Sequence, residues 1–155
     1  MSRVESDTLP PPLRRLLDGE RLEEKVGETI LLITVSASGW PHVAMLSVGE
    51  IVSRAPDGAT LALWQGTETG ENLRREGRAT LVFVAGGAGH YVEVSVTPAG
   101  TVQPGSGTLD RFECRVERAL SDEVGYARLT SGITFDLPDE ADVVARWKET
   151  IAAVD

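Results

Sequence analysis

The residues with the clearest chemical potential lie between an expected strand and an expected short helix. Residues 61–64 are apolar and rich in strand formers, and a helix is expected from about residue 69 to residue 76. Thr67 or Thr69 can cap this helix, because a hydroxyl accepts a hydrogen bond from an unpaired amide of the first turn. Free amides and the helix dipole at such a start attract an anion, commonly a phosphate.

The same stretch also fits an ordinary capped connector helix. Gly70 would let a ligand approach the backbone closely, which favours a site. Glu68 and Glu71 place carboxylates in the same turn, and a phosphate itself carries about −1.5 to −2 at neutral pH. Gly77 is suited to end the helix because glycine adopts a left-handed conformation easily. On residue types alone, the connector helix is the favoured interpretation.

Other side chains with catalytic potential are few. The two histidines, His42 and His90, are far apart in the sequence. Either could ligate a haem iron, but a hydrogen-bonded structural histidine is the favoured interpretation. Cys114 stands in an apolar strand pattern, which predicts a small buried side chain rather than a nucleophile. No zinc, Walker or nucleophile-elbow motif is present. Chemistry in this chain would therefore come from a cofactor.

Composition restricts the class of partner. The 155 residues are expected to form one domain, residues 1–155, with a net charge of −9 at pH 7. That charge argues against non-specific binding to nucleic acid or to an anionic membrane. No apolar run approaches the roughly 20 residues that span a bilayer, and the start of the chain lacks the apolar core of a signal peptide. A single cysteine favours a reducing, cytoplasmic location.

The elements that would position these residues are mostly short strands. We expect a loose arm over residues 1–8, a short helix after the prolines at 10–12 and another over residues 21–26. The expected strands cover residues 30–35, 41–48 with a continuation over 50–54, 61–64, 80–84, 90–97 and 112–120. A short helix is expected from Ser121, and a last helix over residues 138–153. This order predicts a mainly β, antiparallel barrel with small peripheral helices.

Two motifs carry a family resemblance. The hairpin over residues 30–48 contains Gly-Trp-Pro-His at residues 39–42. Residues 63–84 combine a strand, a threonine-rich turn, Asn72-Leu73 opening a short helix, Arg78 and another strand. In this order the motifs resemble the pyridoxamine 5′-phosphate oxidase-like, FMN-binding split-barrel family, over about residues 13–120.

The resemblance implies a fold, a partner and a cofactor site. The fold would be a six-stranded, Greek-key split barrel, and two copies would form a homodimer with FMN at their interface. Arg54 would be a further phosphate cation, and Tyr91 would come from the other subunit. The implied cofactor contacts come from Ala44, Met45, Leu46, Ser47, Trp64, Gln65, Gly66, Thr67, Thr69, Gly70, Asn72 and Arg75.

The sequence departs from the family pattern at the expected phosphate site. Members that hold FMN tightly carry Lys or Arg just ahead of the Asn-Leu pair, whereas residues 68–71 here are Glu-Thr-Gly-Glu. Losing a charge-assisted contact and adding two carboxylates weakens phosphate binding. The C-terminal substrate residues of the true oxidases have no match, so pyridoxamine oxidation is not predicted.

Two functions follow from the sequence. The first is an oxidoreductase that uses FMN, or the deazaflavin F420, on a small organic substrate whose identity the sequence does not give. The second is a non-enzymatic split-barrel dimer that stores, senses or binds FMN, F420 or haem, or that has lost its cofactor.

Overall fold

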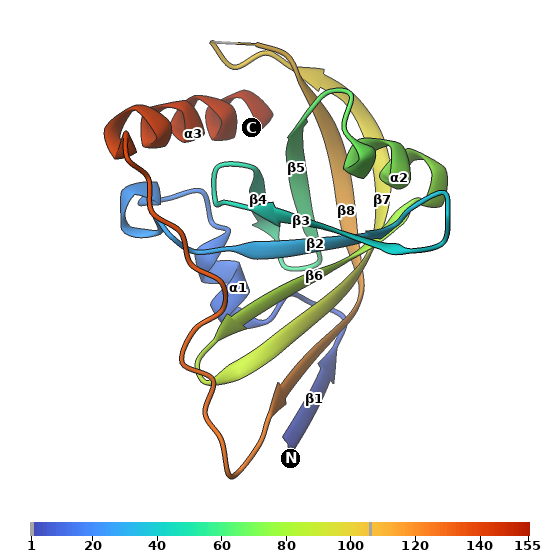
Figure 1. The fold of residues 1–155 in the computed structure, drawn as a ribbon, viewed down its shortest axis with the longest axis vertical. Coiled ribbons are helices and arrows are strands. Elements are labelled where there is room, and N and C mark those ends of the chain that lie inside the picture. Colours follow the sequence, from blue (N-terminus) through green and yellow to red (C-terminus); the bar gives the residue numbers. More distant parts are fainter. Residues whose placement is uncertain (1, 106) are drawn as a thin grey trace.

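In the computed structural model, which describes residues 2–105 and 107–155, the strands join in one 8-stranded antiparallel sheet (Figure 1). Met1 of the expected N-terminal arm lies outside the described residues, and so does Ser106. The strands are β1 (Ser2–Ser6), β2 (Ile30–Val35), β3 (Pro41–Leu46), β4 (Ile51–Ala55), β5 (Gly58–Trp64), β6 (Arg78–Ala85), β7 (Ala88–Val102) and β8 (Leu109–Glu123).

The strand order is β3-β2-β6-β7-β8-β5-β4, with β1 added alongside β8. Strands β6, β7 and β8 are successive antiparallel neighbours, and β5 returns to lie beside β8. This is the arrangement of a Greek key. The predicted mainly β, antiparallel architecture is therefore confirmed.

The expectation of six strands was wrong: within the described residues there are eight, because β1 was not predicted and because the second strand divides into β3 and β4. Between them the backbone turns at Ser47, whose hydroxyl accepts a hydrogen bond from the Gly49 amide at 3.2 Å. The Glu50 carboxylate accepts from both the amide and the hydroxyl of Ser47, at 3.1 and 3.0 Å. This local network separates the two strands close to Gly49, where the sequence predicted a bend or bulge before the continuation over residues 50–54.

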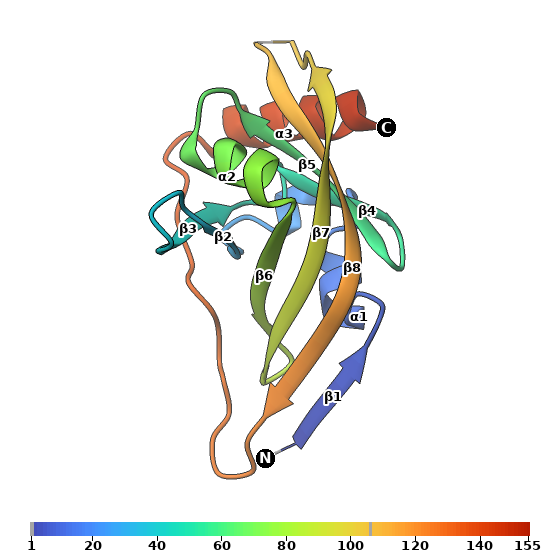
Figure 2. The ribbon, with the colours of Figure 1, turned by 90° about the vertical axis from the view of Figure 1, so that its right-hand side faces the viewer.

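The prediction of a loose N-terminal arm was also wrong for the described residues of that segment. Strand β1 pairs in antiparallel register with the second half of β8, from Ser2 opposite Glu123 to Ser6 opposite Ala119. A bidentate contact from Arg3 to Asp122, at 2.7 and 2.8 Å, reinforces the pairing. Figure 2 shows β1 alongside the lower part of β8.

Within residues 2–105 and 107–155, three α-helices and one 3₁₀ helix accompany the sheet. They are α1 (Pro11–Leu16), the 3₁₀ helix Leu22–Glu24, α2 (Glu68–Glu76) and α3 (Glu140–Val154). The predicted helix from Ser121 does not form, because Ser121 is still part of β8 and pairs with β1 and β7. None of the helices within the described residues combines the length and the apolar character needed to cross a bilayer.

The core lies between the curled sheet and the helices that cover it. Fully buried side chains from α1, β2, β5 and β8 include Leu13, Leu32, Leu61 and Phe112. Helix α3 adds Val144, Trp147 and Ile151 from one face. Figure 1 shows α3 and α2 on different sides of β5, so the two helices flank the strand that leads into the predicted site.

Candidate functional site

Helix α2 begins at the predicted N-cap. Thr67 is extended, with φ −94° and ψ 155°, and its hydroxyl accepts a hydrogen bond from the Gly70 amide at 3.1 Å. The helix ends at Gly77, which has φ 65° and returns its amide to the carbonyl of Leu73. The predicted threonine cap at the start of the helix and the predicted glycine at its end are therefore both confirmed.

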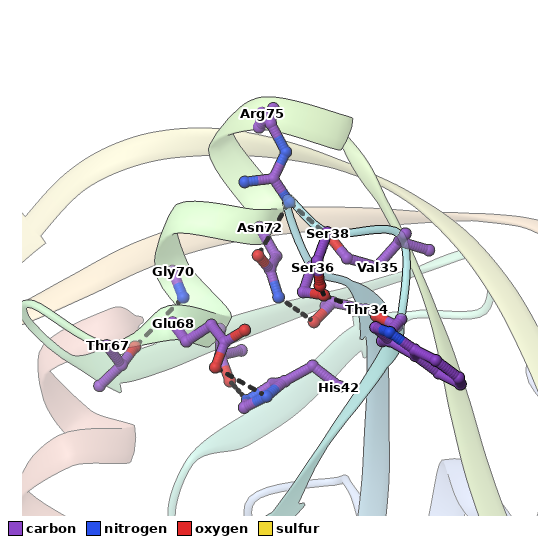
Figure 3. Close-up of polar contacts among 12 residues, drawn as sticks. Thr34, Val35, Ser36, Ser38, His42, Thr67, Glu68, Gly70, Asn72 and Arg75 are labelled. Atoms are coloured by element: carbon purple, nitrogen blue, oxygen red, sulfur yellow. Dashed lines mark hydrogen bonds and ion pairs between the residues drawn. The ribbon is translucent and has the colours of Figure 1, made fainter.

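His42 of β3 binds the first turn of this helix (Figure 3). Its Nε2 lies 3.1 Å from the Thr69 hydroxyl, and its Nδ1 lies 3.2 Å from a carboxylate oxygen of Glu68. Both ring nitrogens therefore have partners. The Glu68 carboxylate remains half exposed at the helix start, where it opposes a second anion.

Asn72 anchors the middle of α2 to the hairpin of β2 and β3. Its side chain is 1% exposed, and its amide donates to the Thr34 hydroxyl at 3.0 Å. Arg75 donates to the Asn72 side-chain oxygen at 2.9 Å and to the Val35 carbonyl at 2.6 Å. Asn72 and Arg75 thus fix the helix onto the hairpin, and Figure 3 shows them in one network with Thr34.

A cavity of about 640 Å³ opens beside the start of α2. Its walls come from the end of β3 and the following turn, from β5, from the first turn of α2, from the loop between β7 and β8, and from one face of α3. The lining residues are Ala44, Met45, Leu46, Gly49, Glu50, Ala62, Leu63, Trp64, Thr67, Thr69, Pro104, Gly107, Thr108, Leu109, Val143, Arg146, Trp147 and Thr150.

The structure divides the predicted cofactor residues into two groups. Those that line the cavity are Ala44, Met45, Leu46, Trp64, Thr67 and Thr69. Those that do not are Ser47, Gln65, Gly66, Gly70, Asn72 and Arg75.

The remaining cation and aromatic candidates lie elsewhere. Arg54 donates to Asp155 and to the Asp18 carbonyl, so its guanidinium is bound at the C-terminus of the chain. Tyr91 is 37% exposed on β7 and does not line the cavity.

Two charged residues of the described cavity lining, Glu50 and Arg146, were not predicted from the sequence. Burial raises the pKa of the Glu50 carboxyl, and its hydrogen bonds from Ser47 oppose that rise. Val143, Arg146, Trp147 and Thr150 follow a spacing of three and four residues, which places them on one face of α3. That spacing was visible in the sequence, but nothing there showed which element the face would meet.

Other reactive side chains have structural roles. His90 is 5% exposed, with Nδ1 2.8 Å from the Ser121 hydroxyl and Nε2 3.1 Å from the Ala85 carbonyl. Burial raises the pKa of the Cys114 thiol to about 12, as expected of an inert core cysteine. In the part of the chain that the structure describes, no three His, Cys, Asp or Glu side chains are grouped to hold a metal ion.

Comparison with known proteins places the chain among its relatives. No protein-family model matches it. It is 40% identical, over 139 residues that make up 90% of each chain, to the uncharacterised protein YclD of Bacillus subtilis.

Two solved structures show the same fold. One is a Lactobacillus delbrueckii protein named for pyridoxamine 5′-phosphate oxidase, with a TM-score of 0.55 and 16% identity over 77% of this chain and 98% of the other. The second is a Clostridium acetobutylicum protein related to general stress protein 26 and assigned to the pyridoxinephosphate oxidase family, with a TM-score of 0.51 and 13% identity over 82% and 98%. The chain therefore belongs to one family with YclD, and its fold is that of the pyridoxamine 5′-phosphate oxidase-like split barrels.

Proposed function

We propose that the protein is a flavin-dependent oxidoreductase that binds FMN in the cavity beside α2. The observation that carries this proposal is the cavity itself, which brings the end of β3, the end of β5 and the capped start of α2 to one space. These are the three elements from which the family resemblance draws its cofactor contacts. The cavity volume of about 640 Å³ is in the range of cofactor pockets.

The residues present fit an isoalloxazine ring well. Met45, Leu46, Leu63 and Trp64 give the cavity an apolar wall. Ala44 is small, so the backbone of β3 is accessible to a flat ring. FMN, when bound, would supply hydride or single-electron transfer, and the chain would supply orientation and exclusion of water.

The fit to the phosphate depends on neutral donors. Thr67 and Thr69 line the cavity at the start of α2, where the amide dipoles favour an anion. No lysine or arginine stands at the helix start, and Glu68 lies there instead. We therefore expect FMN to bind more weakly than in family members with a cation at this position.

We also propose that two copies pair through the outer face of β2 and β3. Val43 and Met45 are 49% and 60% exposed on β3, which ends the sheet. They lie opposite Ile33 and Leu31 of β2, and the row continues to Val82 of β6. A continuous apolar strip of this kind is typical of a protein interface.

FMN binding by the purified full-length protein tests the proposal. We expect added FMN to acquire a shifted absorption band near roughly 450 nm, quenched fluorescence, and reduction by NADH or NADPH. Converting Thr67 and Thr69 together to Ala should lower FMN affinity, while riboflavin, which lacks the phosphate, should bind the variant and the wild type alike. A protein that binds neither FMN nor riboflavin would refute the proposal.

A non-enzymatic cofactor-binding protein is the second candidate. It is favoured by the absence, among the described lining residues, of a histidine or cysteine that could act on a substrate. Bound FMN that NADH and NADPH fail to reduce would support this role. Haem is not favoured as the cofactor, because both ring nitrogens of His42 and of His90 already have partners.

A further inference from the structure

The α3 wall of the cavity is not used by the proposed FMN contacts. Val143, Arg146, Trp147 and Thr150 form this wall, and the start of α2 contributes to another part of the lining. Figure 1 shows α2 and α3 on different sides of β5, so the two helices contribute to the cavity lining from different elements of the fold.

This wall is held rigidly in place. The indole of Trp147 packs directly against Gly49 and meets the Phe135 ring edge to face, with centroids 6.5 Å apart. The end of α3 is bound by a bidentate contact from Arg54 to Asp155, with distances of 2.8 and 2.7 Å. A residue on this helix face therefore has a fixed position relative to the cavity.

Arg146 is the cation of this wall. It is exposed, and none of the ion pairs found within residues 2–105 and 107–155 includes it. By contrast, Arg74 in the last turn of α2 is committed to Asp110 at 2.8 Å and lies over the Phe112 ring. A guanidinium that makes no ion pair among these residues is available to an external anion.

The other charged lining residue does not cancel Arg146. The Glu50 carboxylate is directed to Ser47, from which it accepts two hydrogen bonds, and it makes no ion pair among the described residues. Val143 and Trp147 lie on the same helix face as Arg146 and add apolar contact area to the wall. The wall thus combines one anion-binding group with apolar contact area, the pattern of a pocket that orients a small ligand.

We propose that Arg146 binds the carboxylate of a small organic acid, which is the substrate class of the cavity. The planar guanidinium suits a carboxylate because it can donate two parallel hydrogen bonds. Val143 and Trp147 contact the apolar body of the acid, and FMN occupies the part nearer α2. The oxidoreductase role rests on the proposed function, whereas carboxylate binding by Arg146 does not require the flavin.

Calorimetric titration of the full-length protein with benzoate and with its neutral analogue benzamide tests the inference. Wild type should bind benzoate at least about ten-fold tighter than benzamide, since charge-assisted hydrogen bonds are the stronger kind. Arg146→Ala should abolish this preference by weakening benzoate alone. Lys148→Ala is the matched control, because it removes a cation from the same helix outside the cavity lining and should keep the preference.

The outcomes separate this inference from the flavin proposal. A benzoate preference that depends on Arg146, in a protein that binds neither FMN nor riboflavin, would support the carboxylate site and refute the flavin. FMN binding without any benzoate preference, or with a preference that survives Arg146→Ala, would refute the carboxylate site alone. Lys148→Ala acting like Arg146→Ala would also refute it, because the effect would then be one of overall charge.

Discussion

The indole of Trp147 in α3 occupies the space that a Cβ on Gly49 would need. This contact joins α3 to the turn between β3 and β4, and these two segments contribute Arg146 and Glu50 to the cavity. The position of the α3 wall therefore depends on the absence of a side chain at residue 49.

Gly49→Ala should destabilise the protein by about 1–3 kcal/mol, the usual cost of adding a methyl group to a close-packed contact. Because Trp147 must move, the cavity should also change shape, and benzoate binding should weaken. Urea unfolding measures the stability change. Gly125→Ala is the control, since a Cβ there would meet no atom within 4 Å. Equal stability of the two variants would contradict the packing argument.

Thr67→Ala should cost about 1 kcal/mol, because the Gly70 amide loses its capping partner. Thr67→Ser keeps a hydroxyl at the same place and should retain most of the stability. Thermal unfolding of the three proteins compares them directly. If the serine variant loses as much as the alanine variant, the cap does not explain the effect.

Glu50→Gln should stabilise the protein at neutral pH. The folded protein raises the pKa of Glu50 above its ordinary value of 4.5. At pH values between the unfolded and the folded pKa, the native state therefore holds a proton that the unfolded state has released. Wild type therefore loses stability as the pH rises from the unfolded pKa through the folded one, whereas glutamine does not titrate. Glutamine can still accept the hydrogen bonds from Ser47.

Unfolding free energies between pH 4 and pH 8 check this prediction. The advantage of Glu50→Gln over wild type should grow with pH across the window above 4.5 and then become constant. Glu20→Gln, at an exposed position, supplies the control curve. An advantage that stays the same at every pH would show that the effect is not the titration of Glu50.

Val43→Lys should separate the proposed dimer. The residue is 49% exposed on the terminal strand β3, and two opposed lysines across an apolar interface would repel each other and lose solvation. Analytical ultracentrifugation should then give the chain mass of 16.6 kDa, where wild type gives twice that value. Tyr126→Lys, 92% exposed outside this face, should leave wild-type behaviour unchanged. A monomeric wild type would end the dimer proposal.

The local signals in the sequence predicted local structure well. Thr67 and Gly77 mark both ends of α2, and alternation identified the middle of each long strand, because caps and alternation depend on neighbouring residues. The strand β1 was missed since its residues are polar and gain order only by pairing with β8, more than a hundred residues away.

The candidate site was predicted only in part, because local signals do not show which distant segments come together. Thr67 and Thr69, which were predicted as cofactor contacts, line the cavity because they lie where a strand meets a helix start. Glu50 and Arg146 could not be predicted, since their presence in one cavity lining depends on how α3 packs on the β3–β4 turn. Arg75 was a candidate cation for the phosphate by family resemblance, and in the structure it donates to Asn72 and to the Val35 carbonyl.

The pairing of β1 with β8 has a consequence for handling the protein. Strand β5 covers only the first half of β8, up to Arg115, and β1 covers residues 119–123 on the same side. Deleting the first six residues would uncover unsatisfied backbone donors and acceptors along that edge, which are a template for strand addition by another molecule. Truncated protein should therefore aggregate, whereas the full-length chain keeps this edge paired.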